Sequence, residues 1–91
     1  MNQRDFEADL RRQGYEVVYG GMKAGETNPD HTHDWDARVM VIGGEITVTR
    51  GGEAQTFGVG DSCAVARGEV HAEHVGPHGV AYIAGRRAAA G

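Results

Sequence analysis

The sequence predicts a small all-β protein with one short helix at its N-terminus. Glycine accounts for 15 of the 91 residues, and the glycines are scattered along the chain, which is typical of tight turns between short strands. Several short segments rich in apolar and β-branched residues lie between these turns, and no helical segments alternate with them. This pattern favours a barrel or sandwich over a parallel sheet.

The helix is expected over residues 4–13. Phe6 and Leu10 are four residues apart and share one face, while charged residues fill the rest of the segment. Gly14 follows at the position of a left-handed C-terminal cap. We expect this helix to lie across the barrel or against a partner.

Pairs of turn residues divide the remaining chain into strands. Strands are expected over residues 15–19, 38–42, 45–49, 54–57, 62–66, 71–75 and 80–84, with a break at 20–21, a loop over 23–30 and a turn over 76–79. Gly43-Gly44 and Gly51-Gly52 each separate two such runs, as tight β-hairpin turns do.

We expect residues 1–91 to form a single domain. In this division residues 1–14 are the helical segment, residues 15–85 the barrel and residues 86–91 a tail. A chain of this length has a thin core, so a bound metal or a second subunit would stabilise it. A homodimer is therefore expected.

Charge and composition exclude several kinds of partner. The net charge is −4 and no basic cluster is larger than an arginine pair such as Arg86-Arg87, which argues against nucleic-acid binding. The N-terminus lacks the apolar segment of a signal peptide, and no stretch has the roughly 20 apolar residues of a membrane span. The single Cys63 allows no internal disulfide. We therefore expect a cytoplasmic protein without membrane contact.

Three histidines are the candidate functional residues. His31 and His33 are two residues apart, and such residues on a strand point to the same face, so both rings could reach one ion. A pair of surface histidines is the alternative explanation. His71 is the third candidate because it lies in a second sequence motif, at the spacing given in the next paragraph.

The spacing of these histidines resembles that of the cupin family. Gly25, five residues, His31-x-His33, three residues, Ala37, six residues and Gly44 follow the first cupin motif. The second motif is matched in spacing by Gly60, five residues, Ala66-x-Gly68, two residues and His71. Two spaced patterns in the right order are more specific than either one alone.

The resemblance implies a jelly-roll β-barrel in which both histidines and the glutamate of the first motif, and the histidine of the second, bind one divalent metal. His31, His33 and His71 match, whereas Ala37 stands at the glutamate position, Ala66 at the proline and Val75 at the final asparagine. Because a methyl group cannot bind a metal, three outcomes are open: a three-histidine centre, recruitment of another carboxylate, or loss of the metal.

Glu73 is the best candidate for that carboxylate. It is two residues beyond His71, so alternation along a strand turns both side chains inward. It could bind the metal, orient an imidazole or move a proton; the alternative is a surface glutamate on a bulged edge strand. Asp36 is expected to serve a turn, and Arg38 to form a structural ion pair.

Two functions are consistent with these residues. The first is a mononuclear metal enzyme of oxygenase, isomerase or lyase type, which acts on a small oxygen-bearing molecule with iron, nickel, zinc, copper or manganese. In this case Glu73 is the catalytic residue that moves the proton. The second is a non-catalytic module that binds a small ligand or metal and acts through a partner protein. A metal-free structural dimer is a third, simpler possibility.

Overall fold

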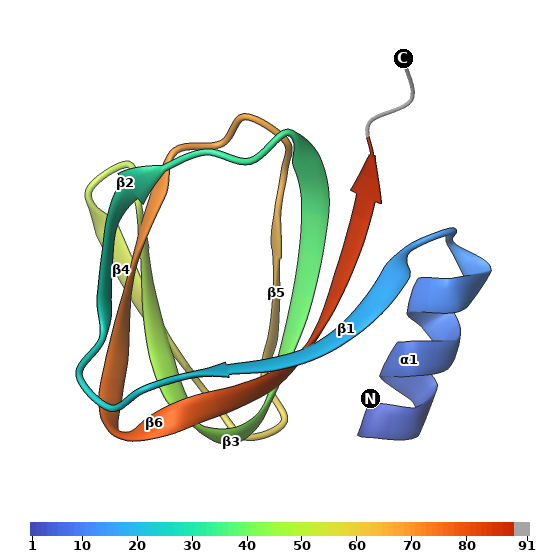
Figure 1. Ribbon diagram of the computed structural model, residues 1–91, viewed down its shortest axis with the longest axis horizontal. Coiled ribbons are helices and arrows are strands. Elements are labelled where there is room, and N and C mark those ends of the chain that lie inside the picture. The colour runs from blue at the N-terminus through green and yellow to red at the C-terminus, as the bar shows by residue number, and fades with distance from the viewer. Residues whose placement is uncertain (89–91) are drawn as a thin grey trace.

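The computed structural model, which describes residues 1–88, is a β-barrel with one helix on its outer face (Figure 1). The elements are α1 (Gln3–Arg12), β1 (Glu16–Met22), β2 (Thr27–His31), β3 (Trp35–Arg50), β4 (Glu53–Gly58), β5 (Ser62–Val65) and β6 (His71–Ala88). All strand pairs are antiparallel. The prediction of an all-β jelly-roll barrel with one short N-terminal helix is confirmed.

Two long strands organise the barrel. β6 pairs with β2 near its start, with β1 near its end, and with β3 along most of its length. β3 pairs in addition with β5 through its first half and with β4 through its second half. One half of the barrel contains β1 and β5, the other half contains β2 and β4, and each of the two long strands takes part in both halves. Both long strands also line the cavity described below.

Gly43-Gly44 does not form the predicted hairpin turn. β3 runs through both glycines, and its register against β6 shifts on either side of them. Gly44 has a φ of +69°, and a Cβ atom there would lie 1.9 Å from the carbonyl oxygen of Gly79. The glycine pair therefore bends the strand and admits a neighbouring backbone, as at a β-bulge, rather than reversing the chain.

Three other breaks predicted from glycine, proline and loop-like residues are also wrong. β1 continues through Gly20-Gly21, β6 continues through residues 76–79, and β2 occupies the second half of the predicted loop over 23–30. Gly20 and Gly21 pair with Tyr82 and Ala81 of β6, and Thr27 and Asn28 pair with His74 and Glu73, so at these two places strand pairing outweighs the local preference for a turn. Within residues 76–79, the carbonyl oxygen of Gly76 accepts a hydrogen bond from the backbone N–H of Gly25 at 3.2 Å. The Gly51-Gly52 turn is confirmed, since Arg50 pairs with Glu53.

The end of β6 differs from the expected tail. The strand continues past residue 85 to Ala88, which pairs with Trp35 of β3. Arg86 and Arg87 are thus part of the sheet, and only residues 89–91 of the predicted tail lie outside the described residues.

The apolar core has two parts, one on each face of the sheet. Inside the barrel, the buried cluster consists of Val41, Ile46, Val48, Phe57, Val75 and Val80, and Cys63 packs against it. Outside, Phe6 and Leu10 of α1 pack on Met40 and Ile83. Burial raises the pKa of the Cys63 thiol, so this side chain packs as a small apolar residue.

The helix ends follow the sequence closely. The Asn2 side chain accepts a hydrogen bond from the backbone N–H of Asp5 at 2.9 Å, and Gly14 has a φ of +81°. These two caps satisfy backbone groups that a short helix would otherwise leave unpaired. The helix lies across the barrel, one of the two positions expected for it.

Candidate metal centre

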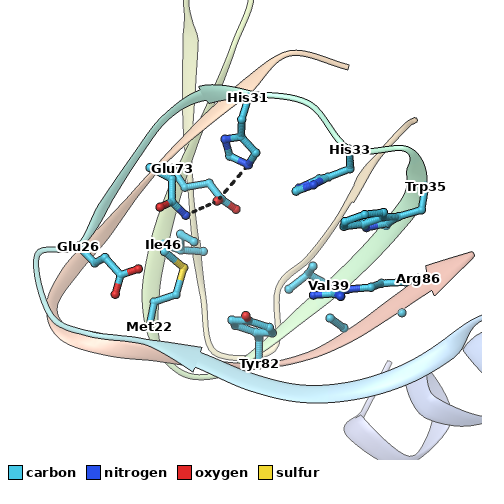
Figure 2. A pocket seen from close by; sticks show the side chains of 14 residues that line it. Met22, Glu26, His31, His33, Trp35, Val39, Ile46, Glu73, Tyr82 and Arg86 are labelled. Atoms are coloured by element: carbon cyan, nitrogen blue, oxygen red, sulfur yellow. Dashed lines mark hydrogen bonds and ion pairs between the residues drawn. The ribbon is translucent and has the colours of Figure 1, made fainter. Parts of the chain in front are cut away.

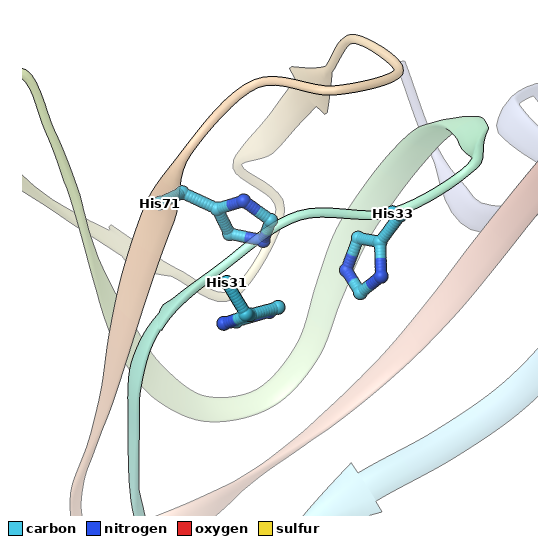
Figure 3. A group of neighbouring side chains, drawn as sticks. All are labelled: His31, His33 and His71. Atoms are coloured by element: carbon cyan, nitrogen blue, oxygen red, sulfur yellow. The ribbon is translucent and has the colours of Figure 1, made fainter.

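Three chain segments bring the histidines together. His31 is the last residue of β2, His71 is the first residue of β6, and the two are paired across the strands. His33 stands in the short connection before β3. Figure 2 shows His31 and His33 at one end of a cavity in the barrel, and Figure 3 shows all three rings facing a common point.

The spacing of the rings fits a single ion. The ring centroids are 4.2 Å apart for His31 and His71, 4.9 Å for His31 and His33, and 5.1 Å for His33 and His71. One ring nitrogen from each residue can be chosen so that all three lie within 4.8 Å of one another. Nitrogens bound to one ion at about 2.0–2.1 Å lie roughly 3–4 Å apart, so small ring movements complete the geometry.

Backbone carbonyls fix the protonation of two rings. The Nδ1 of His31 lies 2.8 Å from the carbonyl oxygen of Pro29, and the Nδ1 of His71 lies 3.0 Å from that of Glu69. A carbonyl oxygen only accepts, so each Nδ1 carries the hydrogen and donates it. In the neutral ring, Nε2 then keeps its lone pair, as a metal-binding histidine requires.

The surroundings of His33 favour its neutral form. Burial lowers the pKa of this imidazole, and the neighbouring His31 and His71 lower it further. Its ring also stacks on Trp35, with centroids 4.6 Å apart and an interplanar angle of 19°. Because a protonated imidazole cannot bind a metal, these effects favour the form that can.

Glu73 faces the cavity from β6, as strand alternation predicts. Its Oε1 accepts a hydrogen bond from Asn28 Nδ2 at 3.0 Å and lies 3.7 Å from His31 Nε2. β6 is an inner strand at this point, because Glu73 is paired with Asn28 on one side and with Val48 on the other. It therefore does not stand on the edge strand considered as the alternative.

The cavity has a volume of about 280 Å³. The methyl group of Ala37, at the position where the family has a glutamate, forms part of its wall, together with Ile46 and Tyr82. Glu26, Asn28, Trp35 and Arg86 supply polar and aromatic groups that sequence reasoning did not assign to a site. For Arg86 a signal was present, since Tyr82, Ala84 and Arg86 continue the alternation of a strand.

Two acidic residues within the motifs, Asp36 and Asp61, do not join the histidine cluster. Asp36 accepts a hydrogen bond from the backbone N–H of Arg67 at 3.0 Å and lies 3.6 Å from Arg87. The Asp61 carboxylate accepts a hydrogen bond from the backbone N–H of Gly58 at 2.9 Å, within the turn between β4 and β5. Neither carboxylate belongs to the group that could hold a metal.

The two remaining histidines do not join the cluster. His74 is exposed, and its Nδ1 lies 3.0 Å from the hydroxyl oxygen of Thr27. His78 is exposed beside Pro77. Neither ring belongs to the group of described residues that could hold a metal.

Comparison with known proteins identifies the family. The sequence pattern of the family described as "Cupin domain" matches residues 18–79. The chain belongs to this family. No curated protein matches this cupin at a significant level.

Solved structures show the same fold. A Rhizobium leguminosarum protein of unknown function has a TM-score of 0.77 at 21% identity, with 84% of this chain and 72% of that chain covered. A cupin superfamily protein from Desulfitobacterium hafniense has a TM-score of 0.70 at 15% identity, over 81% and 67% of the two chains. The polyketide cyclase RemF from Streptomyces resistomycificus has a TM-score of 0.68 at 20% identity, over 79% and 54%.

α1, with its 10 residues, is too short to cross a bilayer, and no other helix in residues 1–88 meets the length and hydropathy that a span requires.

Proposed function

We propose that this cupin is a mononuclear metal protein in which His31, His33 and His71 hold one divalent transition metal. The observation that carries the proposal is the convergence of one nitrogen from each ring to within 4.8 Å of the others. The carbonyls that hold His31 and His71 by Nδ1 support it, because they leave Nε2 as the ligand atom. Three neutral imidazoles suit iron, nickel, zinc, copper or manganese.

We further propose that the centre is catalytic and acts on a small oxygen-bearing molecule in the cavity. A metal at this position would polarise such a molecule as a Lewis acid. Ala37 contributes no ligand, which leaves room beside the histidines for the molecule. Glu73 holds or releases a proton at its Oε1 atom, and Asn28 keeps that carboxylate in place. The reaction would be of oxygenase, isomerase or lyase type.

Ala37 also favours a second candidate function. Replacement of a metal-binding glutamate by alanine is a simple route to a protein that binds a metal or small ligand without turning it over. Such a module would act through a partner protein. An activity assay separates catalysis from binding alone. The metal-loaded protein is incubated with a small molecule that it binds, and the appearance of a product is followed by spectroscopy.

The metal content of tag-free protein tests the proposal. We expect near-stoichiometric divalent metal in the wild type by plasma mass spectrometry, and its loss in His71→Ala and in His33→Ala. Two variants are used because substitution of the buried His71 could disturb folding, whereas His33 is only partly buried and its substitution disturbs the core less. His78→Ala, which changes an exposed histidine outside the cluster, is the matched control and should retain the metal.

The same measurement on Glu73→Gln tests the role of that carboxylate. Metal content equal to that of the wild type is expected if Glu73 moves a proton, and loss of the metal would instead make it a ligand. Wild-type protein that takes up no metal even after reconstitution would contradict the whole proposal.

A further inference from the structure

Arg86 extends from β6 to the mouth of the cavity. Tyr82, Ala84 and Arg86 alternate on one face of the strand and line the cavity, whereas Ile83 packs beneath α1 and Arg87 lies over Tyr15. The residue paired with Arg86 on β3 is Ala37. Its methyl group cannot neutralise the guanidinium, although the family has a glutamate at this position.

The Arg86 guanidinium is exposed and has no acidic partner in the described chain. Glu16 is its paired residue on β1, yet no carboxylate of residues 1–88 lies within the 4.0 Å of an ion pair with Arg86. A cation without an internal partner, at the edge of a cavity, is available to an anion from solution. A planar guanidinium binds a carboxylate through two parallel hydrogen bonds.

An aromatic ring places this cation next to the candidate metal centre. The Arg86 guanidinium carbon lies 5.1 Å from the Trp35 ring centroid, and Trp35 stacks on His33. Figure 2 shows Trp35 between His33 and Arg86. Stacking of this kind limits the movement of the arginine, so an anion bound to it would lie beside the histidines.

The opposite wall of the cavity has the opposite charge. Glu26 and Glu73 lie on the side away from Arg86 (Figure 2), and Glu73 is held there by Asn28. Carboxylates accept hydrogen bonds from hydroxyl groups and repel other anions. A ligand would thus place its negative end toward Arg86 and its hydroxyl groups toward the two glutamates.

We infer that the cavity binds a small hydroxycarboxylate, with the carboxylate on Arg86 and the hydroxyl groups toward Glu26 and Glu73. This class of ligand belongs to the metal centre of the proposed function. Only the role of the metal in binding rests on that proposed function. The contacts with Arg86 and the glutamates belong to the chain itself. The cavity of about 280 Å³ limits the ligand to a small molecule.

Gluconate and sorbitol test this selectivity, because they share a chain of hydroxyl groups and differ in one terminal carboxylate. Trp35 is the only tryptophan and lies beside the proposed anion position, so its fluorescence reports binding. We expect zinc-loaded protein at constant ionic strength to bind gluconate at least about tenfold more tightly than sorbitol. Arg86→Gln should abolish this preference, and Arg86→Lys should retain part of it.

Arg87→Gln is the matched control. Arg87 is the next residue in β6, but it lies on the other face, where it donates to the carbonyl oxygen of Gln13 at 3.0 Å. This variant should keep the preference for gluconate. Equal loss of gluconate affinity in Arg86→Gln and Arg87→Gln, or equal binding of sorbitol and gluconate by the wild type, would overturn the inference.

Zinc content measured on the same samples separates the two proposals. If zinc is bound but gluconate is not preferred, the hydroxycarboxylate inference is wrong and the metal centre stands. If zinc is not retained but metal-free protein still prefers gluconate through Arg86, the metal centre is wrong and the anion site stands.

Discussion

Arg38 illustrates at the scale of one residue how the helix is joined to the barrel. From β3 its guanidinium donates to the Asp9 carboxylate at 2.8 Å and to Gln13 at 3.3 Å, and it lies 5.2 Å from the centroid of the Phe6 ring. The structural ion pair expected for this arginine is therefore present. The hydrogen bond from Arg38, followed by that from Arg12, lowers the pKa of the Asp9 carboxyl below its usual 3.8.

The pH dependence of stability should reflect this pair. Because the folded state lowers the pKa of Asp9, the pair contributes stability above the unfolded-state value of 3.8 and loses it as the pH falls through the lower value of the folded chain. We expect urea denaturation to show that Asp9→Asn is less stable than wild type at neutral pH and equally stable in strong acid. Asp5→Asn, which changes an acidic residue of α1 outside this pair, is the control. A deficit in Asp9→Asn that stayed constant down to strong acid would contradict the assignment.

At the scale of the elements, turn residues misled the sequence prediction in a consistent way. Gly51-Gly52 reverses the chain as predicted, whereas Gly43-Gly44 only bends β3. The two pairs are identical in sequence and differ in surroundings. Nothing in the described chain lies within 4 Å of a Cβ built at Gly51, but the Gly79 backbone lies against Gly44. A contact with a residue 35 positions away is not encoded in the local pattern.

Alanine substitutions should separate these two uses of glycine. Gly51 and Gly44 both have positive φ, +56° and +69°, and this conformation alone makes alanine unfavourable by roughly 1–2 kcal/mol. Gly51→Ala should lose about that much free energy of unfolding. Gly44→Ala also places a methyl group against the Gly79 carbonyl and should lose about 3 kcal/mol or more. Equal losses in urea denaturation, at equal m-values, would show that the close approach is unimportant.

The same distinction explains which site residues could be predicted. His31, His33, His71 and Glu73 follow from the alternation of side chains along a strand and from motif spacing, which are local properties. Asn28 enters the site because β2 pairs with β6, and its partner Glu73 is 45 residues away. Arg86 enters because the last strand continues beyond the predicted tail. Both placements depend on pairing between distant strands. The sequence pattern instead predicts a loop at Asn28 and a tail at Arg86.

At the scale of the whole molecule, a chain of 91 residues forms a barrel that encloses a cavity as well as a core. The buried cluster inside the barrel has six residues, and the second cluster depends on α1. A small domain with this arrangement has little apolar burial in reserve. Dimer formation, expected on this ground from the sequence, stays a prediction, as does the division into a single domain.

Metal binding should therefore have a large effect on thermal stability. A ligand present at 100 times its Kd stabilises the folded state by about 2.7 kcal/mol, which for a chain of this size raises Tm by roughly 10–20 °C. We expect a shift of this order when zinc is added to metal-free wild type in a thermal denaturation experiment, and none in His33→Ala. An equal shift in both proteins would indicate zinc binding elsewhere.

The sharing of β3 and β6 between the two halves of the barrel has a consequence for ligand entry. Since β3 and β6 each pair with strands of both halves, and β3 only bends at Gly43-Gly44, separation of the halves would break the backbone pairing that they share. A ligand of the proposed class would therefore enter through the existing opening, past side chains such as Arg86 and Trp35 that move by rotation about single bonds. Such a receptor is preorganised, and little of the binding energy is spent on closing it.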